Sequence, residues 1–177
     1  MSVITASADY GVLTDEKTLE IQRRLPGPID RVWSYLVDGE KRSKWLASGD
    51  MEPKAGTAFT LTWRNDELTD PPGARPDGFS DEHSMASRIV EFEPPHKLTF
   101  TWGDSGEVTF LLKEAGQGVL LTVIHRGLPD RNMTLMVGPG WHIHLDVLRS
   151  KLSGETPEPF WDGWVRLRSE YERRIPA

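Results

Sequence analysis

Histidines close to carboxylates are the residues of this chain whose types and spacing could support catalysis or metal binding. His142 and His144 stand two positions apart, and Asp146 follows His142 by four. On a helix, residues two apart point about 200° away from each other, so the two histidines cannot bind one ion. His142 and Asp146 could share a metal or a hydrogen bond. Because no third ligand is evident, we expect no metal site and a solvated helix face here.

A second group of candidates lies in a polar stretch and at a strand end. Asp81 and His83 would share a face of an extended segment and could form an acid–base pair. The alternative is a charged cluster at the edge of a loop. His125 shares a strand face with Leu121 and Val123, and it becomes a buried polar group if that face points into the core.

Composition excludes or disfavours several other kinds of chemistry. The chain has 177 residues and no cysteine, which excludes thiolate nucleophiles, disulfides and cysteine-ligated metals. It carries 21 Lys+Arg against 27 Asp+Glu, a formal net charge of -6, and no basic run, so we expect no binding to nucleic acid. No Gly-x-Ser-x-Gly elbow, P-loop or dinucleotide fingerprint occurs, and we expect no cofactor.

The apolar residues are distributed as in one globular domain. They make up 37% of the chain, and about 100–200 residues usually fold around a single core. No window approaches the roughly 18 consecutive apolar residues of a membrane-spanning helix, and the first ten residues lack the pattern of a secretory signal. We therefore expect no membrane span and a cytoplasmic location.

Alternation of apolar and polar residues predicts β-strands. The pattern is clearest at Phe59, Leu61 and Trp63, where every second residue is apolar. Five further segments are predicted strands: residues 18–25, 84–92, 97–102, 107–113 and 119–126. Since most of the six follow one another through short turns, we expect one antiparallel sheet. Residues 65–82, rich in Pro, Gly and Asp, are long for a connection and indicate a functional flap or a mobile excursion.

Helical spacing appears after the first strand and again in the last third of the chain. Residues 29–36 place apolar side chains at i, i+3, i+4 and i+7, which predicts a short amphipathic helix. After Pro129, helical spacing is interrupted at residues 138–140, so we expect the long helix to begin near Gly140 and to end at Gly154. A last amphipathic run follows from Phe160.

This order of elements predicts a curved sheet wrapped around one long helix. A six-stranded antiparallel sheet must bury its apolar face, and the late helix is the long element available to cover it. Such a grip tends to leave a gap, which four of the seven tryptophans could line: Trp45, Trp63, Trp102 and Trp141. The alternative is that these rings simply fill the core.

Five segments of the chain resemble those of a known superfamily. It is similar to the START/Bet v 1-like helix-grip proteins (SRPBCC), and among them to bacterial proteins related to the C-terminal domain of the activator of the 90-kDa heat-shock protein ATPase. The resemblance extends over about residues 14 to 172. Five segments carry it: Leu25-Pro26-Gly27-Pro28-Ile29-Asp30-Arg31-Val32-Trp33, Lys44-Trp45-Leu46, Glu93-Pro94-Pro95-His96-Lys97-Leu98, His125-Arg126-Gly127-Leu128-Pro129, and Gly140-Trp141-His142-Ile143-His144-Leu145-Asp146-Val147-Leu148.

The resemblance implies an α+β helix-grip fold, with residues 1–13 as a tail and residues 14–177 as one domain. Members of the superfamily bind lipids or other hydrophobic molecules between sheet and helix, some catalyse cyclisation or hydrolysis there, and one branch stimulates a chaperone ATPase. No universal catalytic residue accompanies the fold, so fold does not settle function. We expect no counterpart of the additional N-terminal domain of the eukaryotic co-chaperone, which disfavours the chaperone role.

We therefore expect a protein that binds an aromatic or lipid-like small molecule in a cavity, without an assigned catalytic residue. An enzyme of the polyketide-cyclase or hydrolase type and a chaperone-ATPase regulator are the alternatives. The protein could also form a homodimer. His83 or His144 would orient the ligand. The candidate cavity residues are Trp45, Trp63, His83, Trp102, Trp141, His144, Leu145 and Leu148.

Overall fold

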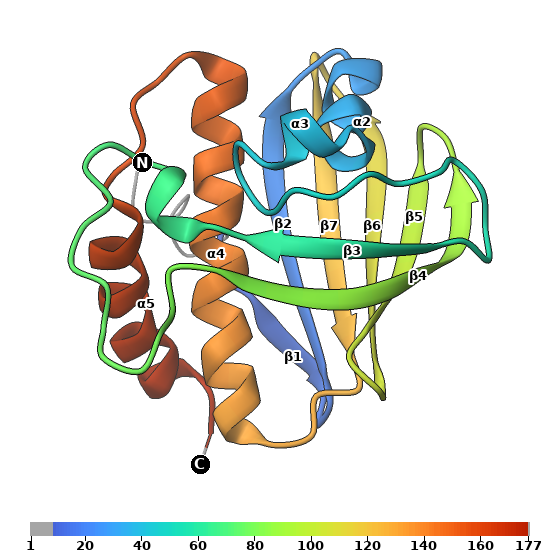
Figure 1. Ribbon diagram of the computed structural model, residues 1–177. Helices are drawn as coiled ribbons and strands as arrows, with labels where there is room; N and C mark the ends of the chain where they lie inside the picture. The colour runs from blue at the N-terminus through green and yellow to red at the C-terminus, as the bar shows by residue number, and fades with distance from the viewer. Residues whose placement is uncertain (1–8, 177) are drawn as a thin grey trace.

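A curved antiparallel sheet that wraps around a long helix organises residues 9–176, the part of the chain that the computed structural model describes (Figure 1). The sheet has seven strands in the order β1-β2-β7-β6-β5-β4-β3. In Figure 1, β2, β7, β6 and β5 run upright behind, while β3 and β4 cross in front of them. This α+β helix-grip arrangement confirms the fold class predicted from the sequence.

The elements follow the predicted order along the chain. The strands are β1 (Val12–Asp15), β2 (Thr18–Pro26), β3 (Ala58–Trp63), β4 (His83–Glu93), β5 (Lys97–Trp102), β6 (Gly106–Ala115) and β7 (Gly118–Arg126). The helices are α2 (Ile29–Val37), α3 (Gly39–Arg42), the 3-10 helix η1 (Asn65–Glu67), α4 (Arg131–Ser153) and α5 (Phe160–Arg174).

Strand alternation gives the sheet one buried face. In β2, Leu19, Ile21 and Leu25 are buried between exposed or half-buried neighbours, as their period of two predicts. The seventh strand, β1, was not predicted. It pairs with β2, and its mostly exposed side chains provide no alternating apolar pattern. Its first two residues, Val12 and Leu13, fall within the segment expected to be a tail.

The predicted interruption of the long helix at residues 138–140 is wrong, because α4 runs unbroken from Arg131 to Ser153 with Pro139 inside it. Asp130 caps its N-terminus by accepting a hydrogen bond from the backbone N–H of Met133 (2.9 Å). Gly138 is buried against α5, where an added Cβ would lie 3.3 Å from Cδ1 of Tyr171. Tertiary packing thus outweighs the poor helix propensity of the Gly-Pro-Gly sequence.

Helix α4 packs between two apolar cores. One of its faces, including Leu145 and Leu148, joins the main core formed with the sheet and α2. Its other face, with Leu135 and Ile143, joins a second core formed with α5. Helices α2 and α3 cover the upper end of the sheet in Figure 1. None of the helices within residues 9–176 has the length and apolar character needed to span a membrane.

Candidate functional site

A pocket of about 420 Å³ lies between α4, the N-terminal end of α5 and the adjoining ends of β3, β4 and β5. Its wall on α4 follows three turns of the helix at helical spacing. The residues that line it are Leu46, Trp63, Asn65, Gly78, Phe79, Ser80, His83, Met85, Trp102, Met133, Met136, Val137, Gly140, Trp141, His144, Phe160, Trp161 and Trp164. Five of the seven tryptophans contribute, and the lining contains no Asp, Glu, Lys or Arg.

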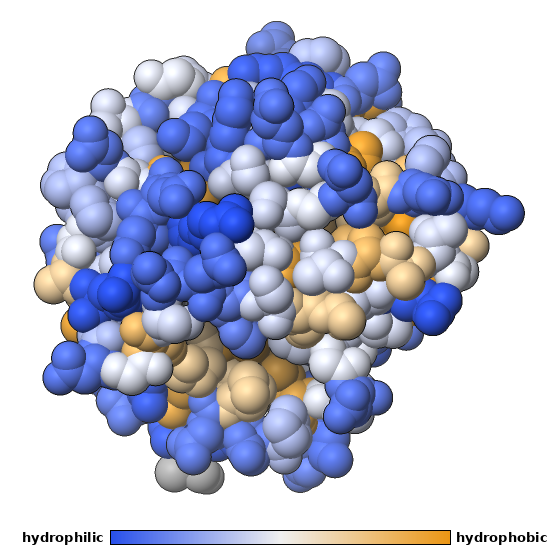
Figure 2. Space-filling model, viewed as in Figure 1, coloured by the Kyte–Doolittle hydropathy of each residue, from blue (hydrophilic) through white to orange (hydrophobic). Residues whose placement is uncertain are grey.

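The pocket opens on an apolar part of the surface. Figure 2 shows apolar residues gathered in the lower part of the view, where α4 runs below β4 in Figure 1. Met133 and Met136 on α4 are each 39% exposed, which is unusual for large apolar side chains in this protein. His144, farther along the same helix, is only 6% exposed. The pocket therefore has an apolar mouth and a buried inner end.

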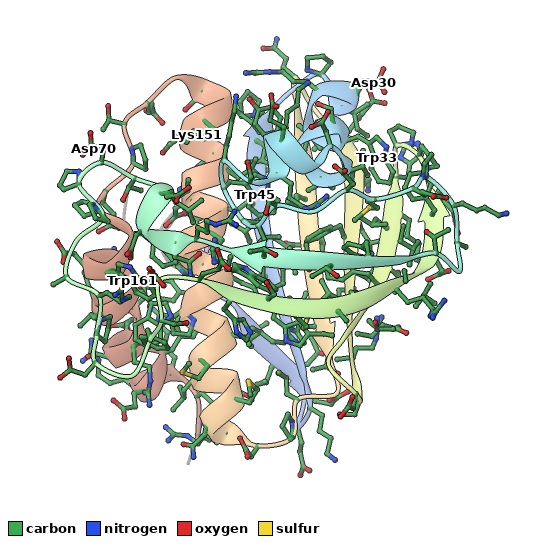
Figure 3. The ribbon with its side chains drawn as sticks, viewed as in Figure 1. Asp30, Trp33, Trp45, Asp70, Lys151 and Trp161 are labelled. Atoms are coloured by element: carbon green, nitrogen blue, oxygen red, sulfur yellow. The ribbon has the colours of Figure 1, made fainter. Side chains whose placement is uncertain are left out.

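Five of the eight predicted cavity residues lie around this pocket, namely Trp63, His83, Trp102, Trp141 and His144. The other three belong to the main core instead: Trp45, Leu145 and Leu148. Leu145 and Leu148 are on the α4 face that packs against the sheet, so they do not line the pocket. In Figure 3, Trp45 lies above β3, whereas Trp161 lies on α5 at the left.

The orientation of His144 is fixed by the backbone of Trp45. The Nδ1 atom of His144 lies 2.7 Å from the carbonyl oxygen of Trp45, which can only accept, so Nδ1 carries the proton and donates. Trp45 is itself held by a hydrogen bond from its Nε1 to the carbonyl of Tyr35 (2.8 Å). Burial lowers the pKa of His144 to about 4. The imidazole is thus neutral at pH 7, and its Nε2 is an acceptor.

His125 is a buried polar group, one of the two outcomes that its strand face left open. It is 1% exposed, and its Nδ1 accepts a hydrogen bond from Nε1 of Trp141 (3.0 Å). Burial lowers the pKa of His125 to about 4. The ring of Trp102 packs edge-on against His125 at a centroid distance of 4.9 Å. These contacts hold two pocket indoles, Trp102 and Trp141, in position.

His83 lies at the surface rim of the pocket rather than in an acid–base pair. It is exposed, and its ring lies 5.7 Å from that of Trp63. The neighbouring Glu82 forms an ion pair with Arg64 (2.9 Å). Within the described residues no hydrogen bond joins Asp81 to His83, so this stretch is a charged loop edge.

His142 and Asp146 are not on a solvated helix face, which corrects the expectation from the sequence. His142 is 5% exposed, and its Nε2 lies 3.6 Å from Oδ2 of Asp146. Nδ1 of His142 faces the hydroxyl of Tyr171 (3.0 Å), which accepts from the backbone N–H of Gly11 (2.7 Å). Burial, together with the positive charge of Arg23, lowers the pKa of His142 to about 2.

Arg23 is the centre of this buried network. Its side chain is fully buried, and its Nε donates to Oδ1 of Asp146 (3.0 Å). Arg149 donates to the same carboxylate oxygen (3.3 Å). Residues 9–176 contain no cluster of three or more His, Asp or Glu side chains placed to hold a metal ion. The network joins β2 to α4 and forms no part of the pocket wall.

Residues of the loop and of α5 complete the pocket, and the sequence patterns did not identify them as site residues. The ring of Phe79 stacks on Trp161 (5.3 Å between centroids) and meets Trp164 edge-on (5.1 Å). The apolar stripe on the final helix could have indicated Phe160 and Trp164. Phe79 gave no such signal, because it stands alone in a loop without periodicity.

The connection between β3 and β4 is fastened to α5. Nε1 of Trp161 donates to Asp66 (2.7 Å), and the backbone N–H of Phe160 donates to the hydroxyl of Thr69 (2.9 Å). Another bond joins the backbone N–H of Trp161 to the carbonyl of Pro72 (2.9 Å). Oδ1 of Asn65, beside the pocket, is the one buried side-chain oxygen or nitrogen without a hydrogen-bond partner in the described part of the chain.

Comparisons with known proteins agree with this architecture. A solution structure of the protein encoded by gene BPP1335 from Bordetella parapertussis is 37% identical, with a TM-score of 0.79, covering 95% of this chain and 91% of that one. The crystal structure of CalU16 from Micromonospora echinospora is 26% identical, with a TM-score of 0.64, covering 87% of this chain and 84% of that one.

Sequence comparison gives the family. No curated protein matches the chain. Residues 26–153 match the family described as Activator of Hsp90 ATPase homolog 1-like protein. This segment begins at the end of β2 and ends with α4, so it contains most of the sheet and the helix that the sheet grips. The chain belongs to the family of Activator of Hsp90 ATPase homolog 1-like proteins.

Proposed function

We propose that this protein binds a hydrophobic small molecule in the pocket between α4, α5 and the start of β4. The observation that carries this proposal is a pocket of about 420 Å³ walled by five tryptophans and by no charged side chain. Its volume lies within the range of about 300–1,000 Å³ typical of small-molecule sites. Burial of a guest against these rings stabilises the complex by about 25 cal/mol per Å² of apolar surface.

The tryptophans provide a direct test, because each indole N–H gives its own resonance in an NMR spectrum of ¹⁵N-labelled protein. Titration with 2-methylnaphthalene should shift the five indole signals of the pocket, from Trp63, Trp102, Trp141, Trp161 and Trp164. The signals of Trp33 and Trp45 should stay in place, since neither residue lines the pocket. Shifts spread equally over all seven signals, or no shift at saturating probe, would contradict the proposal.

Gly140 offers a way to fill the pocket without disturbing the fold. It lines the pocket, and a Cβ added there would meet no atom within 4 Å. Gly140→Leu should therefore abolish binding of 2-methylnaphthalene while the helix stays intact, because leucine also favours helix over glycine by about 0.5–1 kcal/mol. Asn132→Leu is the matched control, since Asn132 is exposed on α4 and outside the pocket.

An enzyme acting in the same pocket is a second candidate, favoured by the neutral imidazole of His144. A base with an unprotonated nitrogen beside a bound guest could accept a proton during a reaction. Replacement of His144 should then abolish turnover, with a loss of binding far smaller than the loss of rate.

The chaperone-regulator alternative is supported by the family resemblance alone, and stimulation of a chaperone ATPase by the purified protein would test it.

A further inference from the structure

The inner end of the pocket presents a hydrogen-bond acceptor whose direction is set by the fold. Nδ1–H of His144 is used by the carbonyl of Trp45 (2.7 Å), which leaves the lone pair of Nε2. No residue in the described part of the chain forms a hydrogen bond with Nε2. In that part of the chain, Asn65 Oδ1 is the one side-chain oxygen or nitrogen that is both fully buried and without a partner. Because Nε2 of His144 has no partner either, it is not fully buried, and it is accessible from the pocket that His144 lines.

Two indole donors of the pocket are already occupied. Nε1 of Trp141 donates to His125 (3.0 Å), and Nε1 of Trp161 donates to Asp66 (2.7 Å). Neither indole can therefore satisfy Nε2 of His144 without losing its present partner. An acceptor in an apolar site stabilises a guest that brings its own donor, because a desolvated lone pair without a donor costs free energy.

The shape of the pocket gives the guest a direction. Met133 and His144 are eleven residues apart on α4, which corresponds to about 17 Å at 1.5 Å per residue. Met133 and Met136 are exposed at the mouth, whereas His144 is buried at the far end. An elongated molecule lying along α4 would thus have one end against a polar nitrogen and the other against methionine side chains.

Charge restricts the guest further. No cationic side chain lines the pocket to compensate an anion, and no carboxylate lines it to compensate a cation. The free lone pair of His144 would also repel an anionic head group at the inner end. A charged group would therefore lose its hydration without receiving a counter-charge, which is strongly unfavourable.

We infer that the guest is a neutral, flat, largely apolar molecule with one hydroxyl or N–H group at its end, and that it binds with this donor against Nε2 of His144. This inference rests on the proposed function and assigns His144 as the residue that determines specificity. The aromatic walls favour a planar guest, because indole rings stack on other rings in offset or edge-to-face geometry.

Two probes of nearly the same shape test the inference in the wild-type protein. In 2-naphthol a hydroxyl occupies the place of the methyl group of 2-methylnaphthalene. We expect 2-naphthol to bind about three- to tenfold more tightly, the gain typical of one hydrogen bond. The anion 2-naphthoate should bind more weakly than either. Equal affinity of the first two, or tightest binding of 2-naphthoate, would overturn the inference and leave the proposed function in place.

Failure of both neutral probes to bind would instead contradict the proposed function.

The orientation of the bound guest is measured from nuclear Overhauser effects. With 2-naphthol bound, the ring protons beside the hydroxyl should contact the imidazole of His144, and the distant ring should contact the methyl groups of Met133 and Met136. The reverse pattern would overturn the predicted orientation.

Substitutions at His144 separate its two nitrogens. His144→Asn retains a donor near the position of Nδ1 for the carbonyl of Trp45 and removes the Nε2 acceptor, so the preference for 2-naphthol should disappear. His144→Gln places an amide oxygen near the position of Nε2 and should retain much of the preference. In each variant the ratio of the two affinities is compared with the wild-type ratio, so that a change in pocket shape that affects both probes cancels. A preference that persists in His144→Asn would overturn the assignment.

Should both variants fail to fold, the wild-type protein still gives an answer. The ¹⁵N resonance of the unprotonated Nε2 of His144 should move upfield when 2-naphthol binds and stay nearly constant with 2-methylnaphthalene. An equal response to the two probes would count against a hydrogen bond from the guest.

Discussion

The indole Nε1 of Trp141 donates a hydrogen bond to Nδ1 of His125 over 3.0 Å, and this bond joins α4 to β7. Both side chains are buried, His125 at 1% and Trp141 at 3% exposure. Because the ring nitrogen that accepts must be unprotonated, the neutral imidazole carries its proton on Nε2. A wall of the pocket is therefore fixed by one contact between a helix and a strand.

Loss of that contact should destabilise the protein. His125→Phe keeps a buried ring but leaves the N–H of Trp141 without an acceptor, which costs about 1–3 kcal/mol of unfolding free energy. Urea denaturation measures this loss. In a double-mutant cycle with Trp141→Phe, the double variant should lose less than the sum of the two single losses. Strict additivity would show that the bond contributes nothing.

Stability should fall as the pH is lowered below 6.5. Burial lowers the pKa of His125 and His144 to about 4 and that of His142 to about 2, from an ordinary value of 6.5. Between pH 6.5 and 4 the unfolded chain therefore binds more protons than the folded one, which gives a slope of up to about 4 kcal/mol per pH unit near pH 5.

Two further features refine this expectation. Burial raises the pKa of Asp146, which reduces the slope because the folded carboxyl takes up its proton at a higher pH. His144→Asn removes one of the three imidazoles and should lower the slope by about 1.4 kcal/mol per pH unit. Denaturation series at pH 7, 6 and 5 give these slopes, and a constant unfolding free energy would refute the assignment of neutral, buried histidines.

Arg23 should be far more sensitive to substitution than arginines at the surface. Arg23→Gln removes the buried cation and leaves Asp146 with only the partly exposed Arg149 as a cationic partner from this network. Removal of one partner of a buried pair typically costs about 3–5 kcal/mol. Arg166→Gln is the matched control, because Arg166 pairs with Glu158 at the surface and such pairs contribute about 0–1 kcal/mol. Similar losses in both variants would contradict this account.

Local opening of the connection between β3 and β4 should increase when Asp66 is replaced. Asp66 accepts hydrogen bonds from Trp161 (2.7 Å) and from Arg75. Asp66→Ala removes both, so amide hydrogen exchange in residues 65–82 should become about tenfold faster, as expected for the loss of roughly 1.4 kcal/mol. Asp77→Ala, at an exposed position of the same connection, is the control. Equal exchange in the two variants would mean that Asp66 does not hold the loop.

Much of the fold could be predicted because alternation and helical spacing are local properties of the chain. The six predicted strands are present with boundaries shifted by at most two residues, and the stripe beginning at Ile29 lies on α2. Helix α4 does not follow the prediction from its local sequence. The helix-breaking tendency of Gly138 and Pro139 is outweighed by packing against Tyr171. That packing is set by α5, which is distant in the sequence.

The site was less predictable than the fold. Burial of Trp45 and Trp63 could be expected from their type. Their tertiary surroundings differ, however: Trp63 ends β3 and lines the pocket, whereas Trp45 follows α3 and is buried in the main core. His142 seemed to lie on a polar helix face because its partners, Arg23 and Tyr171, come from elements far away in the chain. Contacts of this kind leave no periodic signal.

The two apolar cores share helix α4, so the unfolding of one core is coupled to the unfolding of the other. Separation of α5 would uncover Leu135 and Ile143 on one side of α4, while loss of the sheet would uncover Leu145 and Leu148 on the other. Neither half retains a closed interior without the shared element, so sheet and terminal helix behave thermodynamically as a single cooperative unit.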